Sequence, residues 1–146
     1  MEKWYKRFLT VADLVATWSK DPSTKVGAVI VKNRHIIATG YNGFPAGIAD
    51  DERLTDRDKK YPLIIHAEMN AVLQAGCDAW GASLYLSGFN GSPCRNCAKH
   101  LIAAGIVQIV HWKGPVERKE WLEELNLAKK FFEEAGVEIV GVDRGN

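Results

Sequence analysis

The chain has 146 residues, which predicts a single domain spanning residues 1–146. Apolar residues make up 47% and charged residues 25%, a balance that supports a sizeable core and excludes intrinsic disorder. The net charge is +1 without a long basic run, so no nucleic-acid partner is expected. No apolar stretch reaches the roughly 18 residues of a membrane span. The charged N-terminus (MEKWYKRF) is unlike a secretory signal, so we expect a cytoplasmic protein with no membrane partner.

Hydrophobic periodicity predicts a hairpin followed by alternating helices and strands. The expected elements are a helix over 2–18, strands over 25–32 and 35–40, a long polar loop over 41–61, a helix over 66–75, a strand over 83–87, a helix over 94–104, a strand over 107–111, a helix over 116–135 and a strand over 137–142. This alternation predicts a helix-covered sheet with parallel pairing in its later part. Right-handed crossovers then bring helix N-termini to the carboxyl ends of strands, where sites form in such folds. The Trp and Phe residues of the first and last helices fall at core spacing, and Cys77 is expected to pack.

Four residues carry recognisable chemistry. His66 and Glu68 open one predicted helix, and Cys94 and Cys97 open the next. Zinc takes nitrogen and sulfur ligands in a tetrahedral set, and a catalytic site uses three protein ligands with the fourth position left for water. We therefore assign His66, Cys94 and Cys97 as ligands of one catalytic zinc ion. Glu68 is the acid/base beside it, and an N-terminal helix dipole favours the thiolate forms of the cysteines.

Two other interpretations of the cysteine pair stay open. A structural zinc site would need a fourth strong ligand, and none is placed nearby in the sequence. A redox dithiol would leave the His66-x-Glu68 pattern without a purpose. Neither motif is specific by itself. Their combination, H-x-E opening one helix and P-C-x-x-C opening the next, is typical of zinc-dependent nucleobase deaminases.

The sequence also resembles a known family, the deoxycytidylate (dCMP) deaminases of the zinc-dependent cytidine/deoxycytidylate deaminase superfamily. The resemblance runs from about Asp21 to Ile109 and rests on the stretches DPSTKVGAVIV, GYNGFPAG, KYPLIIHAEMNAVL and PCRNCAKHLIAAGI. It implies a three-layer α/β/α cytidine deaminase-like fold with a five-stranded mixed sheet. It also implies conversion of dCMP to dUMP with ammonia release, supplying dUMP for thymidylate synthesis. Some viral members of the family bind a second, structural zinc ion through additional Cys and His residues. Residues 42–61 of this chain contain neither residue type, so one Zn²⁺ per chain is expected.

The resemblance implies further roles by position. His66, Cys94 and Cys97 match the zinc ligands, and Glu68 matches the proton donor. Matches to substrate-binding positions are Ser23, Thr24, Lys25, Asn42 and Ala67. Arg95 is a further candidate on chemical grounds, because its guanidinium is a good fork for phosphate oxygens. Family members are usually homohexamers that dCTP activates and dTTP inhibits. We place Lys25, Asn42 and Gly43 near such an effector nucleotide, with Mg²⁺ accompanying the triphosphate. The cation that takes the substrate phosphate stays open among Lys25, Arg95 and Lys99.

Two rival functions remain at this stage. One is a related zinc deaminase acting on RNA adenosine or on another pyrimidine; an RNA enzyme would carry a basic groove or tail, and this nearly neutral chain ends VDRGN. The other is a non-catalytic, zinc-stabilised assembly module, which would have no need for Glu68.

Overall fold

The computed structural model describes residues 2–88, 93–115 and 119–145. The helices and strands, with η for 3₁₀ helices, are α1 (Glu2–Ala16), β1 (Gly27–Lys32), β2 (His35–Tyr41), η1 (Glu52–Thr55), α2 (Arg57–Lys60), α3 (Ala67–Ala75), η2 (Gly76–Ala79), β3 (Ser83–Ser87), α4 (Arg95–Ala103), β4 (Gln108–Trp112), α5 (Lys119–Ala135) and β5 (Glu138–Val142). Within these ranges, no helix is long and apolar enough to cross a membrane.

The strands form a mixed five-stranded sheet in the order β2-β1-β3-β4-β5 within the described part of the chain. β1 pairs antiparallel with both β2 and β3, whereas β3, β4 and β5 run parallel, as the alternating pattern predicts. Asn33 and Arg34 both have positive φ, at 52° and 61°, which is the backbone of the tight turn that joins β1 to β2. The β1–β2 hairpin is therefore local, and the parallel half needs helical crossovers.

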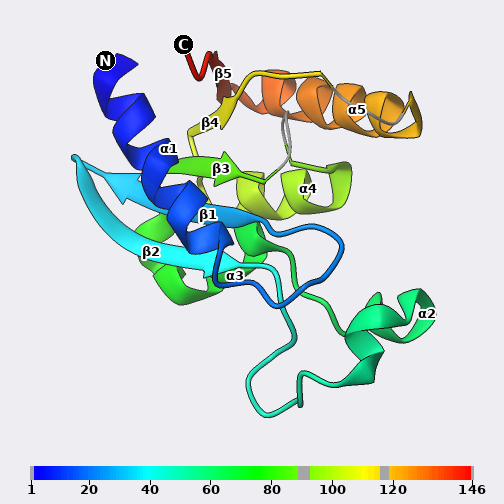
Figure 1. Ribbon diagram of the computed structural model, residues 1–146. Coiled ribbons are helices and arrows are strands. Elements are labelled where there is room, and N and C mark those ends of the chain that lie inside the picture. The colour runs from blue at the N-terminus through cyan, green and yellow to red at the C-terminus, as the bar shows by residue number, and fades with distance from the viewer. Residues whose placement is uncertain (1, 89–92, 116–118, 146) are drawn as a thin grey trace.

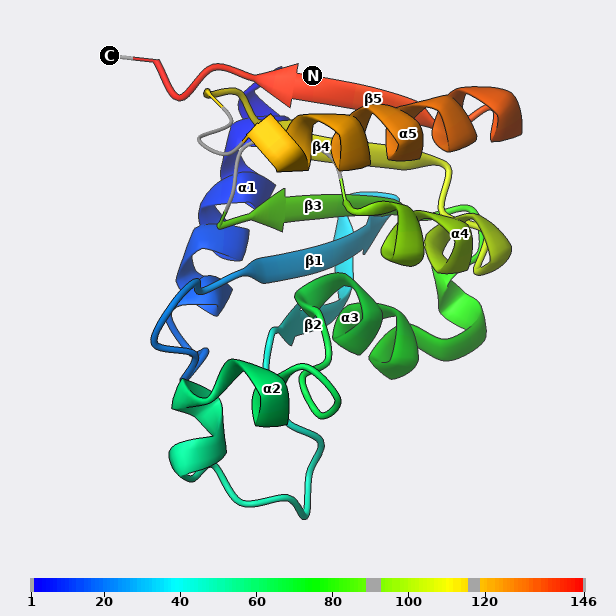
Figure 2. The ribbon, with the colours of Figure 1, turned by 90° about the vertical axis from the view of Figure 1, so that its right-hand side faces the viewer.

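Helices cover both faces of the sheet, so the expected three-layer α/β/α architecture is confirmed (Figures 1 and 2). On one face, α1 buries Leu9, Ala12 and Val15 against inward-facing residues of β1, β3, β4 and β5. On the other face, α3, α4 and α5 pack on the alternate residues of the strands, with Ala71, Leu101 and Phe132 fully buried. This alternation follows from the two-residue period of a strand.

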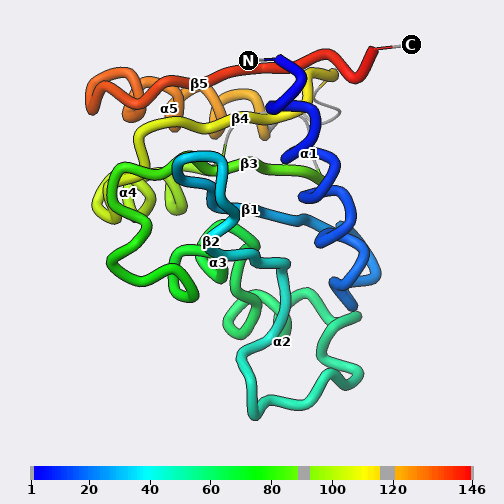
Figure 3. The backbone as a smooth tube through the Cα atoms, turned by 90° about the vertical axis from the view of Figure 1, so that its left-hand side faces the viewer, coloured from blue at the N-terminus to red at the C-terminus, as the bar shows by residue number. Residues whose placement is uncertain are grey.

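The structure corrects some boundaries and burial expectations. The first helix ends at Ala16, because the N–H groups of residues 17–19 bond three residues back in a tight turn. The predicted loop over 41–61 contains η1 and α2, and it projects from the body beyond one edge of the sheet (Figure 3). Cys77 is exposed rather than packed. The prediction of core packing is also wrong for Trp18, Trp121 and Phe131, which are exposed.

One carboxylate on α1 joins several elements at the opposite face. The hydroxyl of Ser87 and the indole N–H of Trp112 donate to Asp13, the latter at 3.0 Å. Arg144 adds two further hydrogen bonds to Asp13, at 3.1 and 3.3 Å. Its guanidinium also lies 4.4 Å from the centre of the Trp112 ring. Asp13 thereby ties α1 to the ends of β3 and β4 and to the segment after β5.

Gly40 allows α3 to lie directly on β2. A Cβ atom at this position would lie 2.4 Å from both the carbonyl oxygen of Ala67 and the amide nitrogen of Ala71. Both of these are backbone atoms of α3, so the helix could not accommodate the extra carbon without moving. A side chain at Gly40 would therefore lift the helix that follows His66.

We predict that Gly40→Ala destabilises the protein, because α3 must shift away from the sheet. Overpacking of this kind costs about 1–3 kcal/mol of unfolding free energy. Denaturant unfolding would measure it. Gly43→Ala is the matched control, since its added Cβ would meet just one side-chain atom, of Tyr41, at 3.9 Å. An unfolding free energy for Gly40→Ala equal to that of the control would contradict the close approach.

Candidate metal centre

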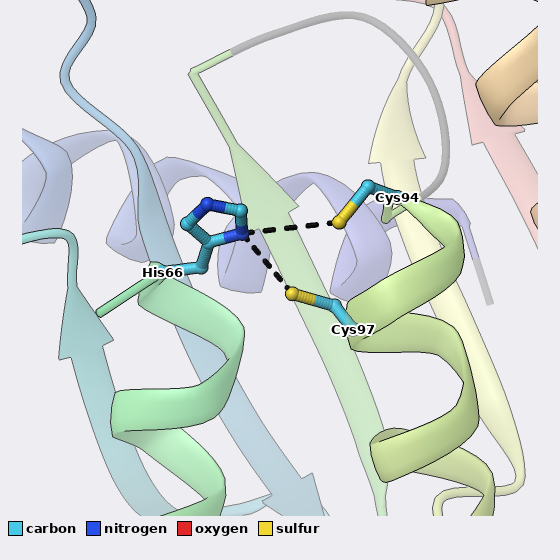
Figure 4. Close-up of side chains that lie close together, drawn as sticks. All are labelled: His66, Cys94 and Cys97. Carbon is cyan, nitrogen blue, oxygen red and sulfur yellow. Dashed lines mark hydrogen bonds between the residues drawn. The ribbon is translucent and has the colours of Figure 1, made fainter. Parts of the chain in front are cut away.

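The two sequence motifs meet where α3 and α4 begin. His66 is the N-cap residue of α3 and Cys94 is the N-cap residue of α4, with Cys97 in the first turn of α4. Both helices start at the same edge of the sheet, where β2 and β3 end. His66 Nδ1 lies 3.2 Å from Cys97 Sγ and 3.9 Å from Cys94 Sγ (Figure 4). Two motifs that are 28 residues apart in the chain thus form one cluster.

This cluster fits a tetrahedral metal ion. The ligand atoms of His66, Cys94 and Cys97 all lie within 4.8 Å of one another. Zinc–nitrogen and zinc–sulfur bonds of about 2.0–2.3 Å, at tetrahedral angles, place nitrogen and sulfur about 3.6 Å apart. The observed nitrogen–sulfur separations of 3.2 and 3.9 Å bracket that value. The three residues can therefore hold one zinc ion, and His66 is exposed enough to leave an approach from solvent.

The protonation of the cysteines favours metal binding. The hydrogen bond from Cys97 is the largest cause that lowers the pKa of Cys94, to about 4, and the hydrogen bond from His66 adds to it. The bond to Cys94 and burial in turn raise the pKa of the Cys97 thiol. The hydrogen bond with Cys94 also raises the pKa of His66. The same hydrogen bonds that hold the three side chains together therefore favour the thiolate form of Cys94, the form that binds a metal ion.

Glu68 lies next to the cluster in a dry environment. Its side chain is on the first turn of α3 and is 2% exposed. Burial raises the pKa of this carboxyl, and its own backbone N–H, the nearby His66 charge and a hydrogen bond from Cys97 oppose that shift. A carboxyl group whose pKa lies above its usual range can hold a proton closer to neutral pH. Such a group suits proton transfer better than permanent charge pairing.

The other predicted binding residues lie at the same sheet edge. Gly27 at the start of β1 pairs with Tyr41 on one side and with Ser87 on the other. The segment before β1, the end of β2 and the end of β3 are therefore neighbours. Ser23, Thr24 and Lys25 lie exposed in that segment, and Ala67 is buried in α3.

Asn42 and Lys25 already have partners within the chain. The buried Asn42 carboxamide accepts from the backbone N–H of Val26 at 2.9 Å and donates to the carbonyl of Thr24 at 2.8 Å. The ammonium of Lys25 donates to the carbonyl of Ser19. Gly43 forms an isolated antiparallel bridge with Ile65, the residue before His66. Of the effector residues proposed from sequence, Gly43 is thus joined through backbone hydrogen bonds to the residue that precedes His66.

The Arg95 side chain pairs with α5. Its guanidinium Nε is 3.3 Å from Glu124 of α5, and its side chain is 61% exposed. Together with Asn96, Lys99 and Phe131, it lines a cavity of about 380 Å³. Arg95, Asn96 and Lys99 come from α4 and Phe131 from α5, so this cavity lies between the two helices.

Sequence reasoning missed two buried charges close to this edge. Lys60 Nζ lies 3.3 Å from Asp21 Oδ1, and the two side chains are 10% and 6% exposed. In the sequence, Lys60 follows Lys59 at the end of a charged loop, and such lysines are ordinarily solvated. Its place in the stretch KYPLIIHAEMNAVL was the one signal that it belongs with the site.

Residues 2–113 match the family model "Cytidine and deoxycytidylate deaminase zinc-binding region". A deaminase from Aliivibrio fischeri is 40% identical over 143 residues, covering 95% of this chain and 93% of that protein. The Homo sapiens deoxycytidylate deaminase is 38% identical, covering 92% of this chain and 77% of that protein. The dCMP deaminase of cyanophage S-TIM5, crystallised with dCMP and dUMP, shares the fold. Its TM-score is 0.75 at 24% identity, covering 97% of this chain and 98% of that one. The chain therefore belongs to the zinc-binding family of cytidine and deoxycytidylate deaminases, and it is a deaminase.

Proposed function

We propose that the chain hydrolyses dCMP to dUMP with release of ammonia, in the cytoplasm, and so supplies dUMP for thymidylate synthesis. The observation that carries this proposal is the buried Glu68 carboxyl beside the His66, Cys94 and Cys97 cluster. Relatives of 38–39% identity in human and mouse are deoxycytidylate deaminases, which supports dCMP as the substrate. A non-catalytic zinc module would have no use for a buried acid at this place.

His66, Cys94 and Cys97 would hold the zinc ion, which at such a three-ligand site supplies a water molecule with a pKa near 7. Glu68 takes the proton of the attacking water and passes it to N3 of the pyrimidine. The oxygen adds to C4 and makes that carbon tetrahedral. Glu68 then takes the proton of the new C4 hydroxyl and carries it to the amino group. The C4–N bond breaks, ammonia leaves and the C4 oxygen becomes the carbonyl of dUMP. Burial raises the pKa of Glu68, which helps it to hold the proton between these two transfers.

We assign nucleotide contacts to Ser23, Thr24, Lys25, Asn42 and Ala67, which lie around the same sheet edge as the cluster. Arg95 remains a candidate for the phosphate if its pair with Glu124 opens. A phosphate bound away from the pyrimidine ring contributes binding energy that the enzyme can use at the reacting carbon.

The same edge offers a route for regulation. Gly43 and Ile65 exchange backbone hydrogen bonds of 3.1 and 2.8 Å, and Ile65 directly precedes His66. A triphosphate bound near Lys25, Asn42 and Gly43, with Mg²⁺, would therefore act on the start of α3. We propose that dCTP activates and dTTP inhibits a homohexamer of single-domain subunits through this contact.

We predict that Glu68→Gln keeps zinc and fold but loses turnover, by on the order of 10²–10⁴-fold in kcat, because the amide cannot relay protons. Cys97→Ala is the comparison, since losing a ligand should remove both zinc and the folding free energy that ligation adds. Ammonia release, metal content and thermal unfolding measure the three effects. A Gln variant with near-normal dCMP turnover would contradict the role of Glu68.

The second prediction concerns the substrate. Free deoxycytidine should show a kcat/KM about 10–100-fold below that of dCMP, which is the worth of one or two charge-assisted hydrogen bonds to phosphate. Ammonia release from dCMP, CMP, dCTP and cytidine, measured side by side, completes the comparison. Equal kcat/KM values for deoxycytidine and dCMP would instead indicate a nucleoside deaminase.

The third prediction concerns effectors at subsaturating dCMP. A coupling of about 1–3 kcal/mol shifts substrate affinity roughly 5–150-fold, so dCTP should raise and dTTP should lower the rate. The dCMP saturation curve should be sigmoidal without effector, and Lys25→Ala should weaken the response to both triphosphates. A hyperbolic curve that neither triphosphate changes, with magnesium present, would remove regulation from the proposal and leave the deamination chemistry intact.

A further inference from the structure

Lys60 is a buried lysine on a short helix that otherwise faces solvent. Its neighbour Lys59 has a side chain that is 63% exposed and lies 4.0 Å from Asp56, whereas the Lys60 side chain is 10% exposed. Taking an ammonium group out of water is costly unless an opposite charge and hydrogen bonds compensate it. Asp21 provides that charge, at 3.3 Å from Lys60 Nζ.

The partner carboxylate organises the segment before β1. Asp21 Oδ1 accepts the backbone N–H groups of Ser23 and Thr24, at 2.8 and 3.3 Å. Asp21 Oδ2 accepts from the side-chain amide of Asn42 at 3.4 Å. Three of the proposed nucleotide contacts therefore depend on the position of one buried carboxylate.

The backbone that follows Lys60 leads to His66 and so to the candidate metal centre. The N–H groups of Leu63 and Ile64 both donate to the carbonyl of Lys60, at 2.9 and 2.8 Å. The next residue, Ile65, is held to Gly43 by two hydrogen bonds, and His66 follows. Lys60 thus lies at the junction between the segment that leads to His66 and the segment that carries Ser23 and Thr24.

We propose that Lys60 is a positioning residue for nucleotide affinity, acting through its buried ion pair with Asp21. The pair fixes the distance between residues 21–25 and the start of α3, and so sets the space into which the nucleotide fits. This rests on the proposed function, in which Ser23, Thr24 and Asn42 face the nucleotide. Because the Gly43–Ile65 bridge holds His66 independently, loss of Lys60 acts on binding and leaves the chemical step intact.

Lys60→Met removes the charge and keeps most of the aliphatic chain. The unpaired Asp21 carboxylate is then drawn towards water, and the N–H groups of Ser23 and Thr24 lose a fixed acceptor. We expect KM for dCMP to rise by about tenfold or more, with kcat within about twofold of the unaltered enzyme. This pattern indicates the loss of a binding interaction that the substrate and the transition state share. Hydrogen exchange of the Ser23 and Thr24 amides should accelerate, and exchange in β1 and β3 should stay unchanged.

Two further variants make the test specific. Lys59→Met removes an exposed charge from the same helix and should leave KM and exchange unchanged. The double variant Lys60→Met with Asp21→Asn removes both charges and keeps an oxygen that can accept from Ser23 and Thr24. Its amide nitrogen cannot accept from Asn42 as Asp21 Oδ2 does, so it should recover part of the lost affinity. It should also fold if the single variant fails to fold.

The outcomes separate this proposal from the function on which it rests. A normal KM or normal exchange in Lys60→Met, or a double variant no better than the single one, overturns the role of Lys60. Absence of dCMP turnover by the unaltered chain overturns the proposed function alone. Exchange at Ser23 and Thr24 would then still decide whether Lys60 holds that segment.

Discussion

The contact between α3 and β2 at Gly40 sets the depth at which the reactive groups lie. Because no Cβ stands between strand and helix, the backbone of α3 approaches β2 closely, and Glu68 on its first turn becomes buried. At the N-terminus of the same helix, His66 remains at the surface. One helix thus presents a solvent-accessible candidate ligand and a buried acid two residues apart. That difference in environment suits the two nearby polar side chains to the different roles proposed for them.

Sheet topology supplies the second half of the site. In the chain, β3 lies between α3 and α4, the two helices that carry the motifs. Its carboxyl end therefore places the start of α4 beside the start of α3. Antiparallel pairing of β1 adds the segment before it to the same edge. The site therefore combines a parallel crossover with the open end of a hairpin. The buried pair of Lys60 and Asp21 joins this edge to the projecting segment that contains η1 and α2.

Much of this could be predicted from sequence, since periodicity places helices and strands and the spacing of His66, Cys94 and Cys97 follows from metal chemistry. What sequence could not predict depends on contacts between distant segments. Lys60 and Asp21 are 39 residues apart, and a lysine in a charged loop carries no sign of burial. The same reason applies to Arg95: its residue type suits phosphate, but its pairing with Glu124 on α5 depends on helix packing. The exposure of Trp121 and Phe131 on α5 likewise depends on which face of the helix meets the sheet.

Asp13 has a consequence for the tolerance of the outer helix to mutation. The aspartate is polar, and about a third of its side chain is exposed, which would ordinarily mark a replaceable surface position. Yet its carboxylate accepts hydrogen bonds from Ser87, Trp112 and Arg144, and Ser87 is the last residue of the strand that leads towards the cysteines. Replacing it would leave the hydroxyl and indole donors without this acceptor at the end of the central strands. A position on the face opposite α3 and α4 is thus constrained by the donors that it must satisfy, although it lies at the surface and outside the candidate site.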